Sequence, residues 1–263
     1  MIEFTKMQGA GNDYVYIDTF HGAPENLPAL AKRVSVRHFG IGSDGLIVIG
    51  PGSDGGDFRM DIYNPDGSRA EMCGNGLRCA AKYVYDKGMT QKTVLTFDTL
   101  AGPRQATLLV EDGKVAGVTA DMGVPQMLDM VPSVDAGPGK FLAAVSMGNP
   151  HAVFLTEDVD AVPLRELGPL LERDPAFPHR TNVEFVEPFG PSAVRMRVWE
   201  RGTGETLACG TGACAVYAAL RAAGMLKGFG EMQLPGGVLY ADYDERGHIL
   251  LTGPAVTVFE GRV

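Results

Sequence analysis

Cysteine, histidine and basic residues are all scarce in this chain of 263 residues. It has 4 cysteines and 5 histidines, and its 23 lysines and arginines face 32 aspartates and glutamates, which gives a formal net charge of −9. An acidic surface repels phosphate backbones, so we expect no nucleic-acid partner. Runs of about 20 apolar residues are also missing, so we expect no association with a membrane.

The spacing of the cysteines argues against two common uses of this residue. Cys73 and Cys79 form a Cys-x5-Cys pair, and Cys209 and Cys214 a Cys-x4-Cys pair. These spacings fit zinc poorly, so we expect no metal. A redox dithiol would need Cys-x-x-Cys, which is absent. The first residues lack the basic and apolar regions of a signal peptide, so we expect a cytoplasmic protein with reduced thiols.

Two similar motifs place a cysteine directly before a Gly-x-Gly sequence and an apolar, alanine-rich helical pattern. They are Cys73-Gly74-Asn75-Gly76 and Cys209-Gly210-Thr211-Gly212, with an offset of 136 residues (209 − 73 = 136). A thiol at a helix N-terminus is suited to proton transfer, because the helix dipole and the N–H groups favour the thiolate. The N–H groups that follow each cysteine form an anion site suited to a carboxylate. They belong to Gly74, Asn75, Gly210 and Thr211.

Other landmarks recur at nearly the same offset, which indicates an internal duplication. Gly88-Met89 and Gly224-Met225 are again 136 residues apart (224 − 88 = 136), and Gly11-Asn12 and Gly148-Asn149 are 137 apart (148 − 11 = 137). A solenoid needs three or more repeats, so two copies favour a pair of similar domains.

Each half has more strand patterns than helix patterns. Helices are expected over 26–38, 74–87, 162–173 and 210–223. Strands are expected over 4–7, 14–18, 46–49, 58–63, 93–97, 105–110, 142–146, 153–155, 183–186, 194–199, 230–234 and 238–243. Because strands outnumber βαβ units, we predict an α+β fold in which mostly antiparallel sheets curl around a helix. Cys79 and Cys214 fall inside the cysteine-led helices and are interpreted as core residues.

Two opposed thiols suggest a reaction at one carbon atom. If both helix ends bind one carboxylate, a thiolate removes the α-proton from one face while the other thiol delivers a proton to the opposite face. The helix ends stabilise the enediolate-like charge that develops, and the stereocentre is inverted. A cysteine hydrolase would use one cysteine with a histidine and leave the second motif unexplained. Purely structural thiols are the remaining alternative.

Several long motifs resemble the diaminopimelate epimerase family. They are Lys6–Asp13, Asn64–Ser68, Met72–Arg78, Gly148–His151 and Glu200–Gly212, and the likeness continues to Leu251–Ala255. The resemblance implies an epimerase independent of pyridoxal phosphate or any other cofactor. It would interconvert LL- and meso-diaminopimelate with two bases, on the route to lysine and, in many bacteria, to peptidoglycan.

The resemblance also implies the domain organisation. The family fold is two pseudo-symmetric domains, each a sheet rolled around a central helix, and its last strand returns to the first domain. We therefore predict one domain over 1–116 plus 255–263, carrying Cys73, and a second over 117–254, carrying Cys209. The composition is compatible with a monomer or a dimer, and members of the family tend to form homodimers.

The same resemblance assigns roles to individual residues. Cys73 and Cys209 correspond to the acid–bases, while His151 and Glu200 correspond to the partners that hold the first and second thiol in their working protonation states. The substrate-binding set comprises Asn12, Asn64, Asn149, Asn182, Glu200 and Arg201, with Gly74, Asn75, Gly210 and Thr211 at the helix ends. Arg201 offers a bidentate fork for a carboxylate. Gly45 departs from the pattern, because some relatives have Gln there.

Two other functions fit the same scaffold. A proline or hydroxyproline racemase-like enzyme shares the paired cysteines, but such relatives usually have His where Asn75 stands. A non-catalytic amino-acid binding protein would have lost one cysteine, and both are present. Asn75 and the Glu200-Arg201 pair therefore favour diaminopimelate as the substrate.

Overall fold

The computed structural model describes residues 1–53 and 55–263, which divide into two units. Unit 1 comprises Met1–Asp121 and Thr252–Val263, and unit 2 comprises Met122–Leu251. The sequence prediction set the crossings at 116/117 and 254/255, a few residues away. The first crossing lies later because Val118 and Ala120 are buried with unit 1. Thr252 is joined to unit 1 by a hydroxyl–hydroxyl hydrogen bond of 2.7 Å to Thr119.

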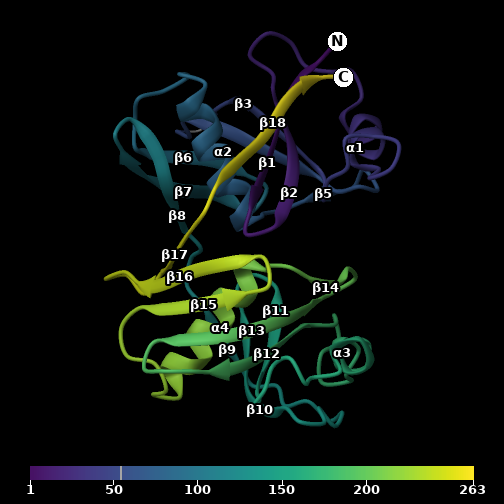
Figure 1. The fold of residues 1–263 in the computed structure, drawn as a ribbon, viewed down its shortest axis with the longest axis vertical. Coiled ribbons are helices and arrows are strands. Elements are labelled where there is room, and N and C mark those ends of the chain that lie inside the picture. The colour runs from purple at the N-terminus through teal and green to yellow at the C-terminus, as the bar shows by residue number, and fades with distance from the viewer. Residues whose placement is uncertain (54) are drawn as a thin grey trace. The chain divides into compact units, whose positions relative to one another are not determined.

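Unit 1 is a curved, mostly antiparallel sheet around one helix. Its strands pair in the order β18-β1-β2-β3-β4-β6-β7-β8, with parallel pairs only at β2–β3 and β4–β6 among the described pairings. The helix α2 contacts β1, β2, β3, β7 and β8 (Figure 1). The elements are β1 (Glu3–Gly9), β2 (Asn12–Asp18), α1 (Leu27–Ser35), β3 (Leu46–Pro51), β4 (Phe58–Tyr63), β5 (Arg69–Ala70), α2 (Gly74–Asp86), β6 (Val94–Thr99), β7 (Gly102–Glu111), β8 (Lys114–Asp121) and β18 (Val256–Arg262).

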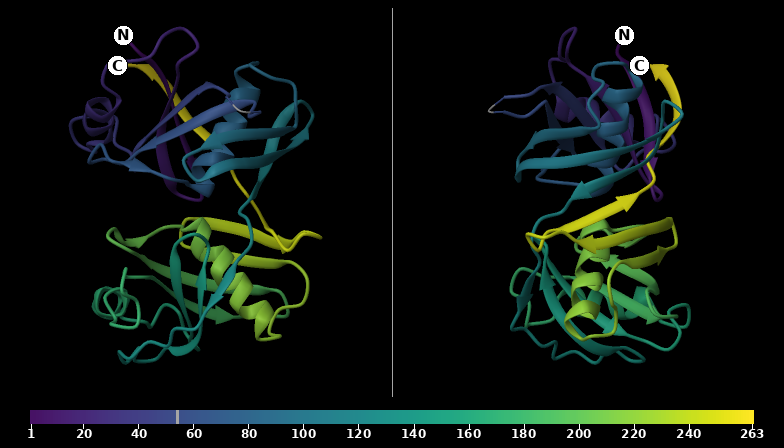
Figure 2. Two further views of the ribbon diagram at one scale, coloured as in Figure 1. Left: turned by 180° about the vertical axis from the view of Figure 1, so that it is seen from behind. Right: turned by 90° about the vertical axis from the view of Figure 1, so that its left-hand side faces the viewer.

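Unit 2 has the same alternation of pairings around its own helix, α4 (Figure 2). The order is β9-β10-β11-β12-β13-β15-β16, with parallel pairs at β11–β12 and β13–β15. The helix α4 contacts β10, β11, β12, β15 and β16. The elements are β9 (Gln126–Leu128), β10 (Lys140–Ser146), β11 (Pro150–Leu155), α3 (Leu164–Glu172), β12 (Asn182–Pro188), β13 (Ala193–Glu200), β14 (Gly204–Thr206), α4 (Gly210–Ala222), β15 (Gly230–Leu234), β16 (Gly237–Tyr243) and β17 (Ile249–Gly253).

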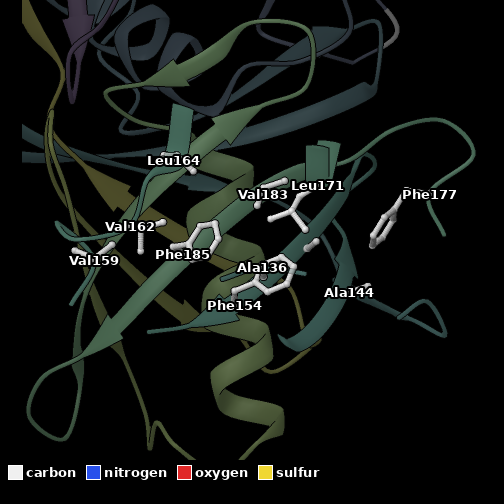
Figure 3. Close-up of a cluster of buried hydrophobic side chains, with 11 residues drawn as sticks. Ala136, Ala144, Phe154, Val159, Val162, Leu164, Leu171, Phe177, Val183 and Phe185 are labelled. Carbon is white, nitrogen blue, oxygen red and sulfur yellow. The ribbon is translucent and has the colours of Figure 1, made fainter. Parts of the chain in front are cut away.

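The sheet of unit 2 buries different side chains on its two faces. Phe154 pairs with Phe185 across β11 and β12, and their stacked rings lie 5.3 Å apart between centroids. These rings pack with Leu164 and Leu171 of α3 in the hydrophobic cluster shown in Figure 3. Because side chains alternate along a strand, the neighbouring residues of β11 and β12 face the other way. That opposite face is the one that carries the polar residues described below.

The structure confirms the predicted fold class, with differences at the ends of elements. Helix α1 ends at Ser35 rather than at residue 38, because Val36 is extended and Gly40 lies against the preceding turn. A Cβ on Gly40 would lie 2.3 Å from the carbonyl oxygen of Arg33, so the chain leaves the helix axis at a point where only glycine fits. Among the described residues, every helix is too short or too polar to cross a lipid bilayer.

Candidate functional site

In unit 1 the thiol of Cys73 caps the N-terminus of α2. Cys73 has an extended backbone, and its Sγ accepts a hydrogen bond of 3.3 Å from the N–H of Gly76. A Cβ on Gly76 would lie 2.6 Å from Cδ1 of Ile47, so a larger residue would displace that side chain. In this arrangement the N–H groups of Gly74 and Asn75 point out of the helix end. The thiol and two N–H donors therefore share one half-buried position.

The hairpin between β1 and β2 brings Asn12 to this thiol. Its two turn residues, Ala10 and Gly11, both have positive φ (53° and 82°), as in the type I′ turns that suit two-residue hairpins. The Cys73 thiol donates to Oδ1 of Asn12 at 3.3 Å, and the amide Nδ2 of Asn75 approaches the same oxygen at 3.5 Å. Asn12 is therefore a direct partner of the Cys73 thiol.

A charged network behind Asn12 fixes the orientation of its amide. Nδ2 of Asn12 donates to Oδ2 of Asp44 at 2.8 Å, and Arg37 donates to the other oxygen of Asp44 at 2.8 Å. Burial raises the pKa of Asp44, and the nearby Asp13 raises it further. Burial acts to raise the pKa of Asp13 too, but Lys6 at 2.5 Å and Arg37 at 3.1 Å lower it below its usual range. The pair Asn12–Asp44 leaves only the amide oxygen to face the thiol.

Gly45 has no room for a side chain. Its φ is +154°, and a Cβ would lie 2.3 Å from the carbonyl oxygen of Tyr63 and 3.0 Å from the ring of Tyr14. A glutamine at this position would need a different local backbone. Asn64, by contrast, is half-buried just after β4, where its amide donates to Oγ of Ser68 at 3.0 Å.

In unit 2 the thiol of Cys209 caps α4 in the same way. Its Sγ accepts from the N–H of Gly212 at 3.4 Å and lies 3.4 Å from the hydroxyl of Thr211. Cys209 is buried, with 6% of its surface exposed. Burial raises its pKa well above the usual value, and the carboxylates of Glu200 and Glu184 raise it further. Cys209 is therefore a protonated thiol at neutral pH.

The polar face of the unit 2 sheet lies beneath this helix end. His151 pairs with Asn182 across β11 and β12, and Glu184 lies two residues further along β12, on the same face. Glu184 pairs in turn with Val198 of β13, so Glu200 lies on that face as well. Nδ1 of His151 is 2.6 Å from Oε1 of Glu184, and Nε2 is 3.1 Å from Oδ1 of Asn149. His151 and Glu184 are fully buried.

Asn182 and Arg201 are joined through the backbone. Nδ2 of Asn182 donates to the carbonyl of Pro150 at 3.1 Å, and its Oδ1 accepts from the backbone N–H of Arg201 at 2.8 Å. Both ends of the Asn182 amide thus hold main chain, which positions the loop that presents Arg201. The guanidinium of Arg201 is exposed and donates to the carbonyl of His179 at 3.0 Å. The carboxylate of Glu200 accepts from the hydroxyl of Thr206.

The expected residues thus form two clusters, one in each unit. Unit 1 brings together Cys73, Gly74, Asn75 and Asn12, with Asn64 in a separate turn. Unit 2 brings together Cys209, Gly210, Thr211, Asn149, His151 and Glu200, with Asn182 supporting Arg201. Within residues 1–53 and 55–263 no group of three or more His, Cys, Asp or Glu side chains is arranged to hold a metal ion.

The sequence reasoning missed three residues that support these two clusters. Asp44 holds Asn12, and Glu184 holds His151. Tyr14 lies beside Cys73; burial raises the pKa of its hydroxyl, and Cys73 raises it further. For Glu184 a signal was present, because a carboxylate between Val183 and Phe185 in a strand of buried residues is costly unless it is paired.

Several solved structures have the same fold as this chain. A Bacillus anthracis phenazine biosynthesis protein of the PhzF family matches with a TM-score of 0.78 at 18% sequence identity, covering 100% of this chain and 98% of that chain. A hydroxyproline epimerase from Agrobacterium vitis matches with a TM-score of 0.74 at 19% identity, covering 100% and 90%. At these identities the likeness shows a shared fold alone.

Sequence comparison identifies the family of this chain. The family model for diaminopimelate epimerase matches residues 4–128 and 143–258. A diaminopimelate epimerase of Acetivibrio thermocellus is 48% identical over 276 residues, covering 100% of this chain and 98% of the relative. One from Parabacteroides distasonis is 51% identical over 262 residues, covering 99% and 97%. The chain belongs to the diaminopimelate epimerase family, and it is an isomerase.

Proposed function

We propose that this chain interconverts LL- and meso-diaminopimelate by proton transfer between its α-carbon and the thiols of Cys73 and Cys209. Membership of the family supports the substrate and the reaction. The observation that carries the two-thiol mechanism is the matched pair of helices, α2 and α4. Each begins with a cysteine whose Sγ accepts from the N–H three residues on, at 3.3 and 3.4 Å.

The proposed reaction moves one proton off the α-carbon and another one on. The substrate carboxylate accepts hydrogen bonds from the N–H groups at the two helix starts. One thiolate takes the α-proton, and the electron pair of the broken C–H bond moves into the carboxylate to give an enediolate-like species. The helix N-termini stabilise that charge. The opposite thiol then donates its proton to the other face, so the stereocentre inverts and the protein exchanges one thiolate for the other.

The second thiol needs a base when it acts as the proton acceptor. Because the pKa of Cys209 is raised by burial and by its neighbouring carboxylates, it is ready to act as the acid. In the reverse direction it must lose a proton. We assign that acceptor role to Glu200, which lies on the same face of the sheet as Glu184 and whose carboxylate raises the pKa of Cys209. For Cys73, the partner that holds the thiol in its working protonation state is His151, whose Nδ1 is held by Glu184.

The distal end of the substrate carries a second carboxylate and ammonium group. We assign its recognition to the exposed Arg201 together with the amides of Asn64 and Asn149, which offer both donors and acceptors. Asn182 serves this site by holding the main chain of Arg201. The supporting observation is that Arg201 directly follows Glu200, the last residue of β13.

We also propose a homodimer and a cytoplasmic location. Five consecutive residues of β18, from Val256 to Glu260, are exposed, and three of them are large and apolar: Val256, Val258 and Phe259. A second chain that covers this strand would remove that apolar surface from water. A thiol mechanism needs a reducing compartment, which supports the cytoplasm. Light scattering of the purified protein and of a Val258→Glu variant tests the dimer; a monomeric wild type contradicts it.

The function is tested by incubating the purified chain with LL-diaminopimelate and separating the stereoisomers. We expect meso-diaminopimelate to form without added pyridoxal phosphate, and no racemisation of proline or hydroxyproline. Cys73→Ala and Cys209→Ala should each abolish the reaction. Cys79→Ala and Cys214→Ala are matched controls in the same two helices, and should retain it. Turnover of proline alone would favour the racemase-like alternative, and full activity of either first variant would exclude a two-thiol mechanism.

A further inference from the structure

We infer that Glu184 is a positioning residue, which fixes the ring of His151 and, through that ring, the amide of Asn149. This inference rests on the proposed function, since it concerns how the unit 2 half of that site is held. Glu184 lies in the middle of β12, where its neighbours Val183 and Phe185 are fully buried. Nothing in an apolar sheet favours a carboxylate at such a position unless it has a specific partner.

The partner of Glu184 is His151, at a distance that makes the contact a strong hydrogen bond. Oε1 of Glu184 and Nδ1 of His151 are 2.6 Å apart, and both side chains have 0% exposure. The two strands are parallel neighbours, and the residues lie diagonally on the same face. The imidazole is therefore held from one side by a carboxylate that water does not reach.

The other side of the ring determines where its hydrogen lies. Nε2 is 3.1 Å from Oδ1 of Asn149, and Nδ2 of Asn149 donates to Oγ1 of Thr211 at 3.4 Å. An amide oxygen only accepts, so Nε2 carries a hydrogen. One further proton is then shared between Nδ1 and Oε1.

The result is a chain of hydrogen bonds that runs from Glu184 through His151 and Asn149 to Thr211 of α4. Glu184 prevents the ring from turning over, the ring holds the oxygen of Asn149, and the NH2 group of Asn149 is directed to Thr211 in the first turn of α4. That NH2 group is a donor beside the N–H groups that we assign to the substrate carboxylate. Without Glu184, no contact fixes the hydrogen of the imidazole on Nε2, and the orientation of the Asn149 amide is no longer fixed either.

The first turn of α4 is shaped around this carboxylate. A Cβ on Gly212 would lie 2.8 Å from Oε1 of Glu184, so the glycine of the cysteine motif leaves the space that Glu184 occupies. Oε2 of Glu184, also buried, makes no hydrogen bond within the described part of the chain. A carboxylate present only to stabilise the core would have both oxygens satisfied. Glu184 instead directs a single oxygen at His151.

Two substitutions separate the effect of the length of the Glu184 side chain from the effect of its charge. Glu184→Gln keeps the length of the side chain, and its NH2 group can donate to Nδ1, which leaves the hydrogen on Nε2. Glu184→Asp keeps the charge but is one methylene shorter, so the contact is lost. A positioning role predicts that the Gln variant retains kcat/KM to within about threefold, whereas the Asp variant loses about tenfold or more, mainly through KM. Glu187→Gln is the control, since Glu187 lies on the same strand but is paired with Arg195.

The second readout is the tautomer of His151, followed by the nitrogen resonances of its imidazole and assigned with a His151→Asn variant. We expect protonated Nε2 in the wild type and in Glu184→Gln, and loss of this fixed state in Glu184→Asp. Because the thiol of Cys209 interacts electrostatically with Glu184 and Glu200, all samples are compared at one pH. Thermal unfolding confirms that each variant is folded.

Two outcomes overturn the inference. Wild-type kinetics and an unchanged tautomer in Glu184→Asp would show that the contact positions nothing. A Gln variant that keeps the tautomer but is as impaired as Asp would assign the role to charge. If the wild type itself fails to epimerise diaminopimelate, the proposed function fails, while the tautomer measurement still tests the role of Glu184.

Discussion

The different environments of the two thiols lead to a prediction about their reactivity. An ordinary thiol with a pKa of about 8.5 is roughly one-tenth ionised at pH 7.5, and each further unit of pKa reduces the thiolate fraction about tenfold. Burial, Glu200 and Glu184 raise the pKa of Cys209 well above its usual value. We therefore expect iodoacetamide to alkylate Cys209 at pH 7.5 at least tenfold more slowly than in the urea-unfolded chain.

The assay follows alkylation of each cysteine-containing peptide by mass spectrometry against time and pH. The rate at Cys209 should keep rising by about tenfold per pH unit beyond pH 9, where an ordinary thiol has levelled off. Glu200→Gln removes one of the charges that raise the pKa, so alkylation at pH 7.5 should become several-fold faster. Glu231→Gln in β15 is the matched control and should leave the rate unchanged.

The exposed fraction of Cys209 is small, so access and ionisation must be distinguished. Poor access slows alkylation equally at every pH, whereas a raised pKa moves the midpoint of the rate–pH curve. A midpoint near pH 8.5, unchanged in Glu200→Gln, would refute the reasoning. It would mean that water or a rearranged side chain screens Glu200 and Glu184 from the sulfur.

Three further predictions concern the surroundings of the thiols. Gly45→Gln should lower the free energy of unfolding by about 2–4 kcal/mol, because its Cβ would lie 2.3 Å from a carbonyl oxygen at a positive φ. Urea titration measures this change, and an unchanged midpoint would show that the backbone moves easily. Asp44→Ala should raise KM about tenfold by releasing the amide of Asn12, whereas wild-type steady-state rates would mean that Asn75 alone holds it. Burial raises the pKa of Cys79 to about 11, because the folded protein favours the protonated thiol. The stability gained from this preference is present below pH 8.5 and is lost as the pH rises towards 11. That loss is about 2–3 kcal/mol, and Cys79→Ala should flatten the dependence of urea stability on pH over this range.

The helices that carry the thiols were predictable because their signals are local. Each follows a cysteine and a Gly-x-Gly sequence, and the predicted ranges 74–87 and 210–223 end one residue beyond the observed Asp86 and Ala222. The last strand, β18, was expected only from the resemblance to the family, because no local pattern in Val256–Arg262 indicates where its partner lies. Its structure comes from pairing with β1, at the far end of the chain.

The supporting groups of the site could not be predicted because they depend on strand register. Nothing local to His151 indicates that a carboxylate 33 residues away lies against its Nδ1. The same holds for Asn12 and Asp44, which meet because β2 pairs with β3 and Asp44 lies just before β3. Asn182 was expected to bind substrate, but both ends of its amide bind the main chain, so its role is proposed as indirect.

The central claim is that two opposed thiols exchange protons with one carbon atom. The direct measurement is the reaction of LL-diaminopimelate in deuterated water, stopped at low conversion. Two thiols predict that the meso product carries deuterium at the inverted α-carbon, because the donating thiol has exchanged with solvent, while the recovered LL substrate carries almost none. A single base that returns the abstracted proton predicts hydrogen in the product. Product that retains hydrogen at early times, or recovered substrate as deuterated as the product, would contradict the two-thiol account.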